Sequence, residues 1–253
     1  MIDSHCHLHH CKLDEAPAIV QNAAESGLTH IIQVSTDPDS FYWGLEFTKE
    51  ERAVPISLSA GLYPTRAEKP WAKSFEEIKK IVETHRICAV GEIGIDMYHD
   101  TSYVDEQIKM MRAQMELAAE HNLPVILHIR KSFEEVYKIA KEFEGKVTGV
   151  WHCFDGEYDE ALKMMDLGYY ISLSGLVTFN SAKELQEVAK KLPLEKLMIE
   201  TDSPYLSPVP KRGKKNQPSH VVHTFDFLCE LKDVPKNETE KILDHNTNTL
   251  FSL

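Results

Sequence analysis

The amino-acid sequence predicts an α/β fold, most specifically a (β/α)8 TIM-type barrel that forms a single domain over residues 1–253. Eight apolar, β-branched runs alternate with segments of helical periodicity, a rhythm typical of parallel sheets covered by helices. The chain length is close to the roughly 250 residues that such barrels commonly have. Histidines and carboxylates also end five of the runs, and side chains from that many strands converge naturally only where a sheet closes on itself. A doubly wound open sheet is the alternative, but it would normally place its site at one topological switch.

The predicted strands follow one another along the whole chain. They are expected near residues 2–8, 30–36, 55–62, 88–95, 124–129, 147–154, 169–175 and 197–201. The clearest helices are expected at Val104–His121, 133–143 and 158–167, where apolar residues recur with helical spacing. No Ser/Gly-rich linker or sharp change of composition divides the chain, so we expect no second domain.

The composition is that of an ordinary globular protein, with 42% apolar and 27% charged residues. No apolar run is long enough to predict a membrane span, and the first residues do not resemble a secretory signal. The five cysteines are scattered and odd in number, which favours reduced thiols in a cytoplasmic protein. A net charge of -12 argues against general attraction to nucleic acid, although bound cations could still create a local phosphate site.

His5 and His7 are the first candidate site residues, in the segment Asp3-Ser4-His5-Cys6-His7. Alternate side chains of a strand share one face, so both imidazoles could bind one cation while Cys6 points into the packing. Taken alone, the pair is equally consistent with polar residues at the edge of a His-rich surface loop.

Glu92 is the next candidate, in Gly91-Glu92-Ile93-Gly94-Ile95-Asp96. The glycines on either side permit close approach of a neighbouring strand. A carboxylate that ends an apolar run would be costly to bury without a partner, and a cation would remove that cost. A salt bridge to Arg130 is the alternative.

Two further histidines also end predicted strands. His128 precedes Arg130 by two residues, so an imidazole and a guanidinium would share one face, which suits a metal ligand beside a phosphate clamp. His152 ends the sixth predicted strand. Taken alone, His152 would more often be a histidine of the core. Only the other candidate ligands support its assignment as a metal ligand.

Asp202 follows the last predicted strand, in Glu200-Thr201-Asp202-Ser203-Pro204. It could bind a metal and accept a proton from water, while helix capping or turn formation is the alternative role. A basic run at residues 211–215 comes shortly afterwards. It could steer a phosphate backbone, although such runs are often only solvated loops.

Imidazoles and carboxylates without thiolates suit Zn, Mg, Mn or Fe and do not choose among them. Together the motifs resemble those of the TatD family of metal-dependent deoxyribonucleases, within the amidohydrolase superfamily, and the resemblance runs nearly end to end. It rests on Asp3-Ser4-His5-Cys6-His7, Gly91-Glu92-Ile93-Gly94-Ile95-Asp96, Leu127-His128-Ile129-Arg130, His152-Cys153-Phe154 and Glu200-Thr201-Asp202-Ser203-Pro204-Tyr205-Leu206.

The resemblance implies a barrel with two divalent metal ions per chain, held by two sets of ligands that share one carboxylate. By family analogy the ligands are His5, His7 and Asp202 for one ion, His128 and His152 for the other, and Glu92 as the bridge. The resemblance also implies 3′-to-5′ exonuclease action on DNA, at single-stranded or frayed 3′ ends, with a role in DNA repair or degradation.

The chain departs from the family at Tyr63, in Gly61-Leu62-Tyr63-Pro64, where relatives commonly carry His. A neutral phenol can donate a hydrogen bond but carries no positive charge, so the departure bears on substrate preference. Tyr63, Tyr98 or Phe179 could also stack on a terminal base.

The sequence therefore predicts a metal-dependent hydrolase acting on ester bonds, most specifically a deoxyribonuclease whose attacking water is activated by two metal ions. Asp202 and Glu92 are the expected catalytic residues, and Arg130, Tyr63 and Arg212 are the expected substrate-binding residues. DNA is the expected partner, with no membrane and no obligate protein partner.

Two alternatives stay open at this point. The same site could cleave an ester or amide in a small molecule or in an aminoacyl-tRNA. A non-catalytic barrel with a structural metal is the other alternative, but structural sites are usually closed and four-coordinate around one ion.

Overall fold

The computed structural model describes residues 1–12, 14–98 and 100–253. Eight parallel strands form one sheet in sequential order, which confirms the predicted (β/α)8 fold class. Their bounds are β1 Ile2–Cys6, β2 His30–Gln33, β3 Ile56–Ala60, β4 Ala89–Asp96, β5 Val125–Arg130, β6 Gly149–Trp151, β7 Tyr170–Leu173 and β8 Leu197–Ile199. All eight lie within or almost within the predicted ranges, and most are shorter because the runs continue into the loops at the strand ends.

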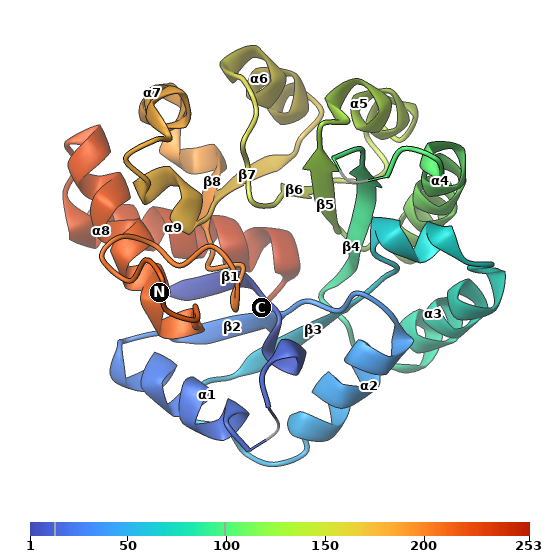
Figure 1. Cartoon of the computed structure of the whole chain (residues 1–253), viewed down its shortest axis with the longest axis horizontal. Helices are drawn as coiled ribbons and strands as arrows, with labels where there is room; N and C mark the ends of the chain where they lie inside the picture. Colours follow the sequence, from blue (N-terminus) through green and yellow to red (C-terminus); the bar gives the residue numbers. More distant parts are fainter. Residues whose placement is uncertain (13, 99) are drawn as a thin grey trace.

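The sheet curves round so that its last strand meets its first. Cys6 and Ser203 form a parallel bridge, and the amide of Asp202 donates a hydrogen bond of 2.9 Å to the carbonyl of His5. Figure 1 shows the strands around a common centre with the helices outside them. Closure therefore brings the segment after β8 beside the start of the chain.

Helices connect the strands and cover the outside of the sheet, as the alternating pattern predicts. Their bounds are α1 Ala16–Glu25, α2 Pro38–Phe47, α3 Ala72–Thr84, α4 Val104–His121, α5 Phe133–Glu142, α6 Tyr158–Asp166, α7 Lys183–Lys191, α8 Val221–Lys232 and α9 Lys236–Phe251. Short 3-10 helices add η1 Leu8–His10, η2 Pro64–Glu68, η3 Gly175–Thr178, η4 Leu194–Lys196 and η5 Pro218–His220. Over the described residues, no helix is both long enough and apolar enough to span a membrane.

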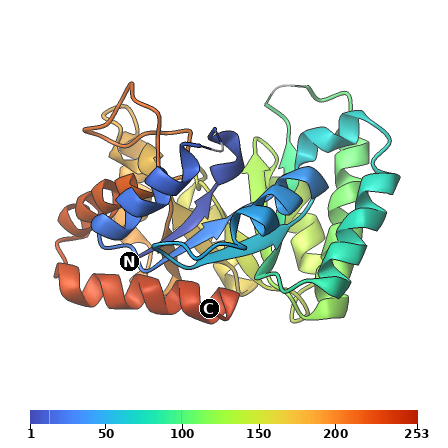
Figure 2. The same ribbon diagram turned by 90° about the horizontal axis from the view of Figure 1, so that it is seen from below.

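The amino end of the barrel is closed by apolar packing against α9, which runs beneath the strands in Figure 2. We call this group the floor cluster. It consists of Ile32, Val34, Cys88, Ala89, Ile126, Val150, Met198, Leu250 and Phe251. Because apolar side chains fill this end, the buried polar side chains that could carry chemistry gather towards the carboxyl ends of the strands.

Two glycines set the close pairing of β4 with β5. A Cβ atom added to Gly91 would lie 2.6 Å from the Cβ of Ile126, and one added to Gly94 would lie 2.0 Å from the carbonyl oxygen of His128. Only glycine permits this approach, as the sequence suggested. The tight pairing places Glu92 beside the strand that carries His128.

Candidate metal centre

The six predicted ligands come together at the carboxyl end of the barrel, although their chain positions run from 5 to 202. All of them except His5 line a cavity of about 690 Å³ that opens at the barrel mouth. Three of them lie beyond their strands. His7 directly follows β1, His152 directly follows β6, and Asp202 lies three residues after the end of β8.

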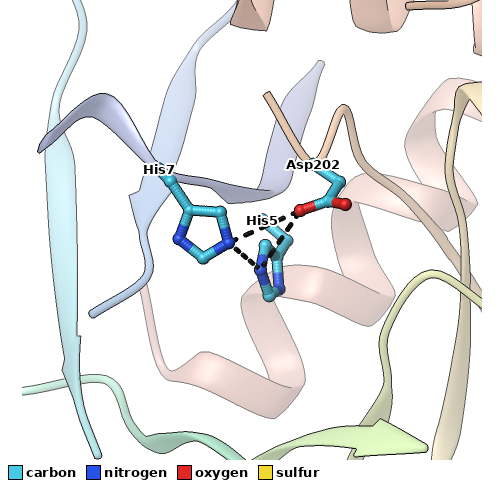
Figure 3. A group of neighbouring side chains, drawn as sticks. All are labelled: His5, His7 and Asp202. Atoms are coloured by element: carbon cyan, nitrogen blue, oxygen red, sulfur yellow. Dashed lines mark hydrogen bonds and ion pairs between the residues drawn. The ribbon is translucent and has the colours of Figure 1, made fainter. Parts of the chain in front are cut away.

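The first set of ligands joins β1 to the loop after β8 (Figure 3). The Nε2 atoms of His5 and His7 lie 3.1 Å apart, and Oδ1 of Asp202 lies 3.4 Å from Nε2 of His7 and 3.8 Å from Nε2 of His5. All three side chains are largely buried. Two imidazole nitrogens and one carboxylate oxygen therefore face one point.

A hydrogen bond to the backbone fixes the tautomer of His7. Nδ1 of His7 lies 2.9 Å from the carbonyl oxygen of Val34, which can only accept, so Nδ1 carries the proton. The Nε2 lone pair is then free to face Asp202 and His5. A backbone contact of this kind commonly orients a histidine that binds metal.

The second set of ligands joins β4, β5 and the residue after β6. Oε1 of Glu92 lies 2.9 Å from Nδ1 of His128 and 2.8 Å from Nε2 of His152, and these two nitrogens are 3.3 Å apart. The geometry again brings two imidazole nitrogens and one carboxylate oxygen together.

Glu92 faces both sets, with one oxygen towards each. Its other oxygen, Oε2, lies 3.6 Å from Nε2 of His5 and 3.5 Å from Nε2 of His7. Oε2 is buried and accepts no hydrogen bond from any described residue. A buried acceptor left without a partner costs about 1–3 kcal/mol, and a cation beside each oxygen would remove that cost. The residues present therefore fit two divalent ions with Glu92 between them.

Charge in the cluster favours an ionised carboxylate. Burial alone would raise the pKa of Glu92, but the imidazoles of His152, His128 and His5 outweigh burial and hold that pKa well below its usual range. Burial also opposes the protonation of His152, yet Glu92 and Glu200 raise its pKa well above the usual value. Without metal the cluster therefore holds protons where cations would bind, and the two compete.

The backbone turns sharply at two of these positions. Asp202 has a φ of 53° and Cys153, directly after His152, has a φ of 47°. L-residues enter this left-handed region at a cost, and Asp does so more readily than most. Such conformations often mark functional sites, and here one lies at a predicted ligand and the other directly after one.

Tyr63 and Asp96 contact the outer side of His128. Nε2 of His128 lies 3.2 Å from Oδ2 of Asp96 and 3.3 Å from the hydroxyl of Tyr63, which is 3.4 Å from the same carboxylate oxygen. Tyr63 also lines the cavity. The structure thus places this tyrosine against a ligand as well as against the space for substrate.

The two arginines named from the sequence differ in position. Arg130 lines the cavity, with its guanidinium 4.0 Å above the ring of Tyr98. Arg212 is not among the residues that line the cavity, and its guanidinium lies 3.8 Å above the ring of Phe179. One face of each ring is therefore already covered by a cation, which leaves less of Tyr98 and Phe179 for a base.

Other residues of the cavity wall were not predicted. Arg66 lines the cavity and pairs with Asp37 at 2.6 Å, and Tyr205 is 51% exposed at its rim. Nothing in the sequence around Arg66 signals this position, because η2 enters the wall only through the tertiary fold. Tyr205 lies within the motif that contains Asp202, so its neighbourhood could have indicated it.

The fold and the ligand clusters together define a class of protein: a (β/α)8 barrel that carries a metal-binding hydrolase site at the carboxyl ends of its strands. A family model described as TatD related DNase matches residues 2–252. The chain belongs to the TatD family.

Curated relatives cover the whole chain and agree on the general activity. YabD of Bacillus subtilis is 34% identical over 256 residues, covering 100% of this chain and 99% of the relative. YjjV of Escherichia coli is 33% identical over 255 residues, covering 100% and 98%. Both are named as uncharacterized metal-dependent hydrolases, and the chain is accordingly a metal-dependent hydrolase.

Solved structures agree with the fold. The crystal structure of the TatD homologue YjjV from Escherichia coli matches with a TM-score of 0.94 at 32% identity, covering 100% of this chain and 98% of that one. A TatD family hydrolase from Entamoeba histolytica matches with a TM-score of 0.88 at 23% identity, covering 99% and 97%, which supports the fold alone.

Proposed function

We propose that the chain is a deoxyribonuclease that removes nucleotides from the 3′ end of DNA, single-stranded or frayed. The observation that carries the proposal is that Arg130 and Arg66 line the same cavity as the ligand clusters. A phosphodiester is anionic and would be repelled by Glu92 and Asp202 unless cations offset them. Guanidinium groups bind phosphate with two parallel hydrogen bonds, so this wall favours a phosphate ester over a neutral ester or amide.

The size of the cavity supports action at a strand end. Its volume of about 690 Å³ lies within the roughly 300–1,000 Å³ of small-ligand pockets, which suits a terminal nucleotide rather than a duplex. Tyr205 at the rim and Tyr63 on the wall offer aromatic surface on which a base could stack. Such stacking tolerates any base, as an exonuclease requires.

The residues that would hold the two ions are those of the two sets. One ion would be held by His5, His7 and Asp202, the other by His128 and His152, with one oxygen of Glu92 towards each. When bound, two divalent ions supply Lewis-acid activation of water and offset the charge on the phosphate.

The protein's own groups account for positioning and proton transfer. Arg130 would orient the terminal phosphate, and Asp202 would take the proton of the attacking water. Burial alone would raise the pKa of Asp202, but the nearby imidazoles of His7, His5 and His152 lower it, so this carboxylate is ionised and able to accept. The water oxygen bonds to phosphorus, the bond from phosphorus to the 3′ oxygen of the preceding nucleotide breaks, and that oxygen gains a proton.

The test compares substrates under one set of metal conditions. The metal-free chain is reloaded separately with Zn²⁺, Mn²⁺ or Mg²⁺ and given 5′-labelled single-stranded DNA. Stepwise shortening from the 3′ end, blocked by a 3′-terminal phosphorothioate, is the expected result. Hydrolysis of p-nitrophenyl acetate or of an aminoacyl-tRNA with DNA left intact would overturn the proposal in favour of an ester hydrolase. No hydrolysis of any of them with any metal would favour a non-catalytic barrel.

Arg130→Gln tests the phosphate clamp. We expect it to raise the KM for DNA about tenfold, because one charge-assisted bidentate contact is lost. Arg112→Gln is the matched control, since Arg112 is a partly exposed arginine that pairs with Glu142 outside the cavity wall. Equal KM values for the two variants would contradict a role for Arg130 in binding DNA.

A further inference from the structure

Glu200 lies directly behind the ligand clusters and was not among the predicted ligands. Its side chain is fully buried. Oε1 accepts a hydrogen bond from the backbone amide of Cys153 at 2.8 Å and lies 3.3 Å from Nδ1 of His152. Because Nε2 of His152 faces Glu92, Glu200 contacts the outer nitrogen of a ligand of the second set.

Two buried atoms in the same place lack hydrogen-bond partners among the described residues. They are Oε2 of Glu200 and Nδ1 of His5. The ligand atoms of His5, His152 and Glu200 lie within 4.8 Å of one another, and the two imidazole rings are stacked with their centroids 4.0 Å apart. The imidazole nitrogen can donate a proton and the carboxylate oxygen can accept one, although the two atoms form no hydrogen bond with each other here.

Metal binding would decide which nitrogen of His5 carries the proton. A cation held by Nε2 of His5, together with His7 and Asp202, needs the lone pair of that nitrogen, so the proton must sit on Nδ1. A protonated Nδ1 in this interior then needs an acceptor, and Oε2 of Glu200 is the unused acceptor of that cluster.

We propose that Glu200 is a positioning residue for both metal ions, holding His152 through Oε1 and His5 through Oε2. It would fix the tautomer of one ligand from each set and so couple the two metal sites. This inference rests on the two-ion part of the proposed function and not on DNA as the substrate.

Two other ligand histidines are contacted at the ring nitrogen that faces away from the proposed ion, and each of these contacts involves only one set of ligands. Nδ1 of His7 donates to the carbonyl of Val34, and Nε2 of His128 contacts Asp96. Asp96 is therefore the matched control: it is a buried carboxylate that contacts one ligand histidine, whereas Glu200 contacts His152 and lies in one cluster with His5 as well.

The first experiment measures metal affinity without any substrate. The metal-free full-length chain is titrated with Zn²⁺ against a competing chromophoric chelator, in the wild type, Glu200→Gln and Asp96→Asn. The glutamine oxygen can still accept from the amide of Cys153 and from His152, but it carries no charge, and the NH₂ group in place of Oε2 cannot accept from Nδ1 of His5. We expect Glu200→Gln to weaken both ions by about 10–100-fold, and Asp96→Asn to weaken chiefly one.

Several results would overturn the inference. Unchanged affinities for both ions in Glu200→Gln would do so, as would a weakening of only one ion to the extent that Asp96→Asn shows. A wild type that binds three ions and a Glu200→Gln variant that binds two would assign Glu200 as a ligand of a third ion instead.

The second experiment reads the proton directly, and its deciding measurement uses only the wild type. In the ¹⁵N-histidine-labelled wild type, loading with Zn²⁺ should produce protected Nδ1–H signals for His5 and His152 as well as for His7. In Glu200→Gln the first two should shift or exchange rapidly, while the His7 signal stays, because its acceptor is a backbone carbonyl. A zinc-loaded wild type in which Nδ1 of His5 carries no proton would contradict the proposal, whatever the nuclease assay shows.

Discussion

The two ends of the barrel are both buried but differ in chemistry. At the amino end the floor cluster packs apolar side chains of the strands against Leu250 and Phe251 of α9. At the mouth, four imidazoles and the carboxylate of Glu92 are buried together, with Oε2 left unpaired. Apolar burial stabilises a fold, whereas a buried charged cluster stabilises it little or costs free energy until a ligand arrives. The amino end of the barrel therefore contributes mainly to stability, and the mouth contributes mainly to chemistry.

The largest expected effect is at the mouth. Glu92→Gln should lower metal-dependent hydrolysis roughly a thousandfold, because it removes the charge between the two proposed ions, an effect of several kcal/mol on the transition state. The measurement is kcat/KM at saturating metal, with far-UV circular dichroism to verify folding. Full activity in this variant would show that the cluster at the mouth is not the catalytic site.

At the floor, truncation should affect stability and leave chemistry alone. Leu250→Ala should lower the free energy of unfolding by about 2–5 kcal/mol, because Leu250 is 6% exposed within the floor cluster. Leu162→Ala in α6, where the leucine is 36% exposed, is the control and should cost about 1 kcal/mol or less. Urea unfolding measures both, and a change in kcat for folded Leu250→Ala would break the separation between the two ends.

The stability of the fold is expected to depend on pH through His220, which contacts the loop beside Asp202. His220 contacts Asn216, whose side chain donates to the carbonyls of Thr201 and Tyr205 on either side of Asp202. Burial and the nearby Lys211 lower the pKa of His220 from 6.5 to about 4. The unfolded chain then binds a proton at a higher pH than the folded chain. The contribution of this group is therefore fully present above pH 6.5 and is lost as the pH falls towards about 4.

His220→Gln removes this titration and should give a shallower fall in stability. The measurement is the Tm of the metal-free chain between pH 7 and pH 4.5, in wild type and variant. Parallel curves for the two proteins would show that His220 does not contribute to acid sensitivity.

The smallest expected effect concerns the hydroxyl of Tyr63. Tyr63→Phe removes contacts to His128 and Asp96 while keeping the ring, so kcat should fall about fivefold, equivalent to about 1 kcal/mol for one hydrogen bond. Steady-state kinetics at saturating metal measures it. A loss as large as that of Glu92→Gln would place Tyr63 among the groups that act on the reacting atoms.

The sequence was informative where the position of a residue follows from the strand to which it belongs. Apolar runs located the strands, and the residue types at their ends brought His5, Glu92 and His128 to notice because parallel strands end on one side of a barrel. It was less informative where the neighbour comes from elsewhere in the chain. Glu200 acquires a role only through contact with Cys153 and the histidine before it, which no local pattern encodes.

The cavity wall shows the same limit. Arg66 reaches it through η2, and no motif marks that residue. Arg212, by contrast, looked important because it lies in a basic run, yet its guanidinium packs on Phe179 outside the cavity wall. Charge along a sequence predicts attraction, but only the closed barrel decides which charges face the substrate.

The bridge between Cys6 and Ser203 has a consequence for biosynthesis. Of the three side chains proposed to hold one ion, His5 and His7 lie in and directly after the first strand, and Asp202 is made about two hundred residues later. A nascent chain therefore cannot hold that ion with all three ligands until translation has passed Asp202 and the final strand has docked. Chains that end before Asp202 are therefore expected to lack hydrolytic activity.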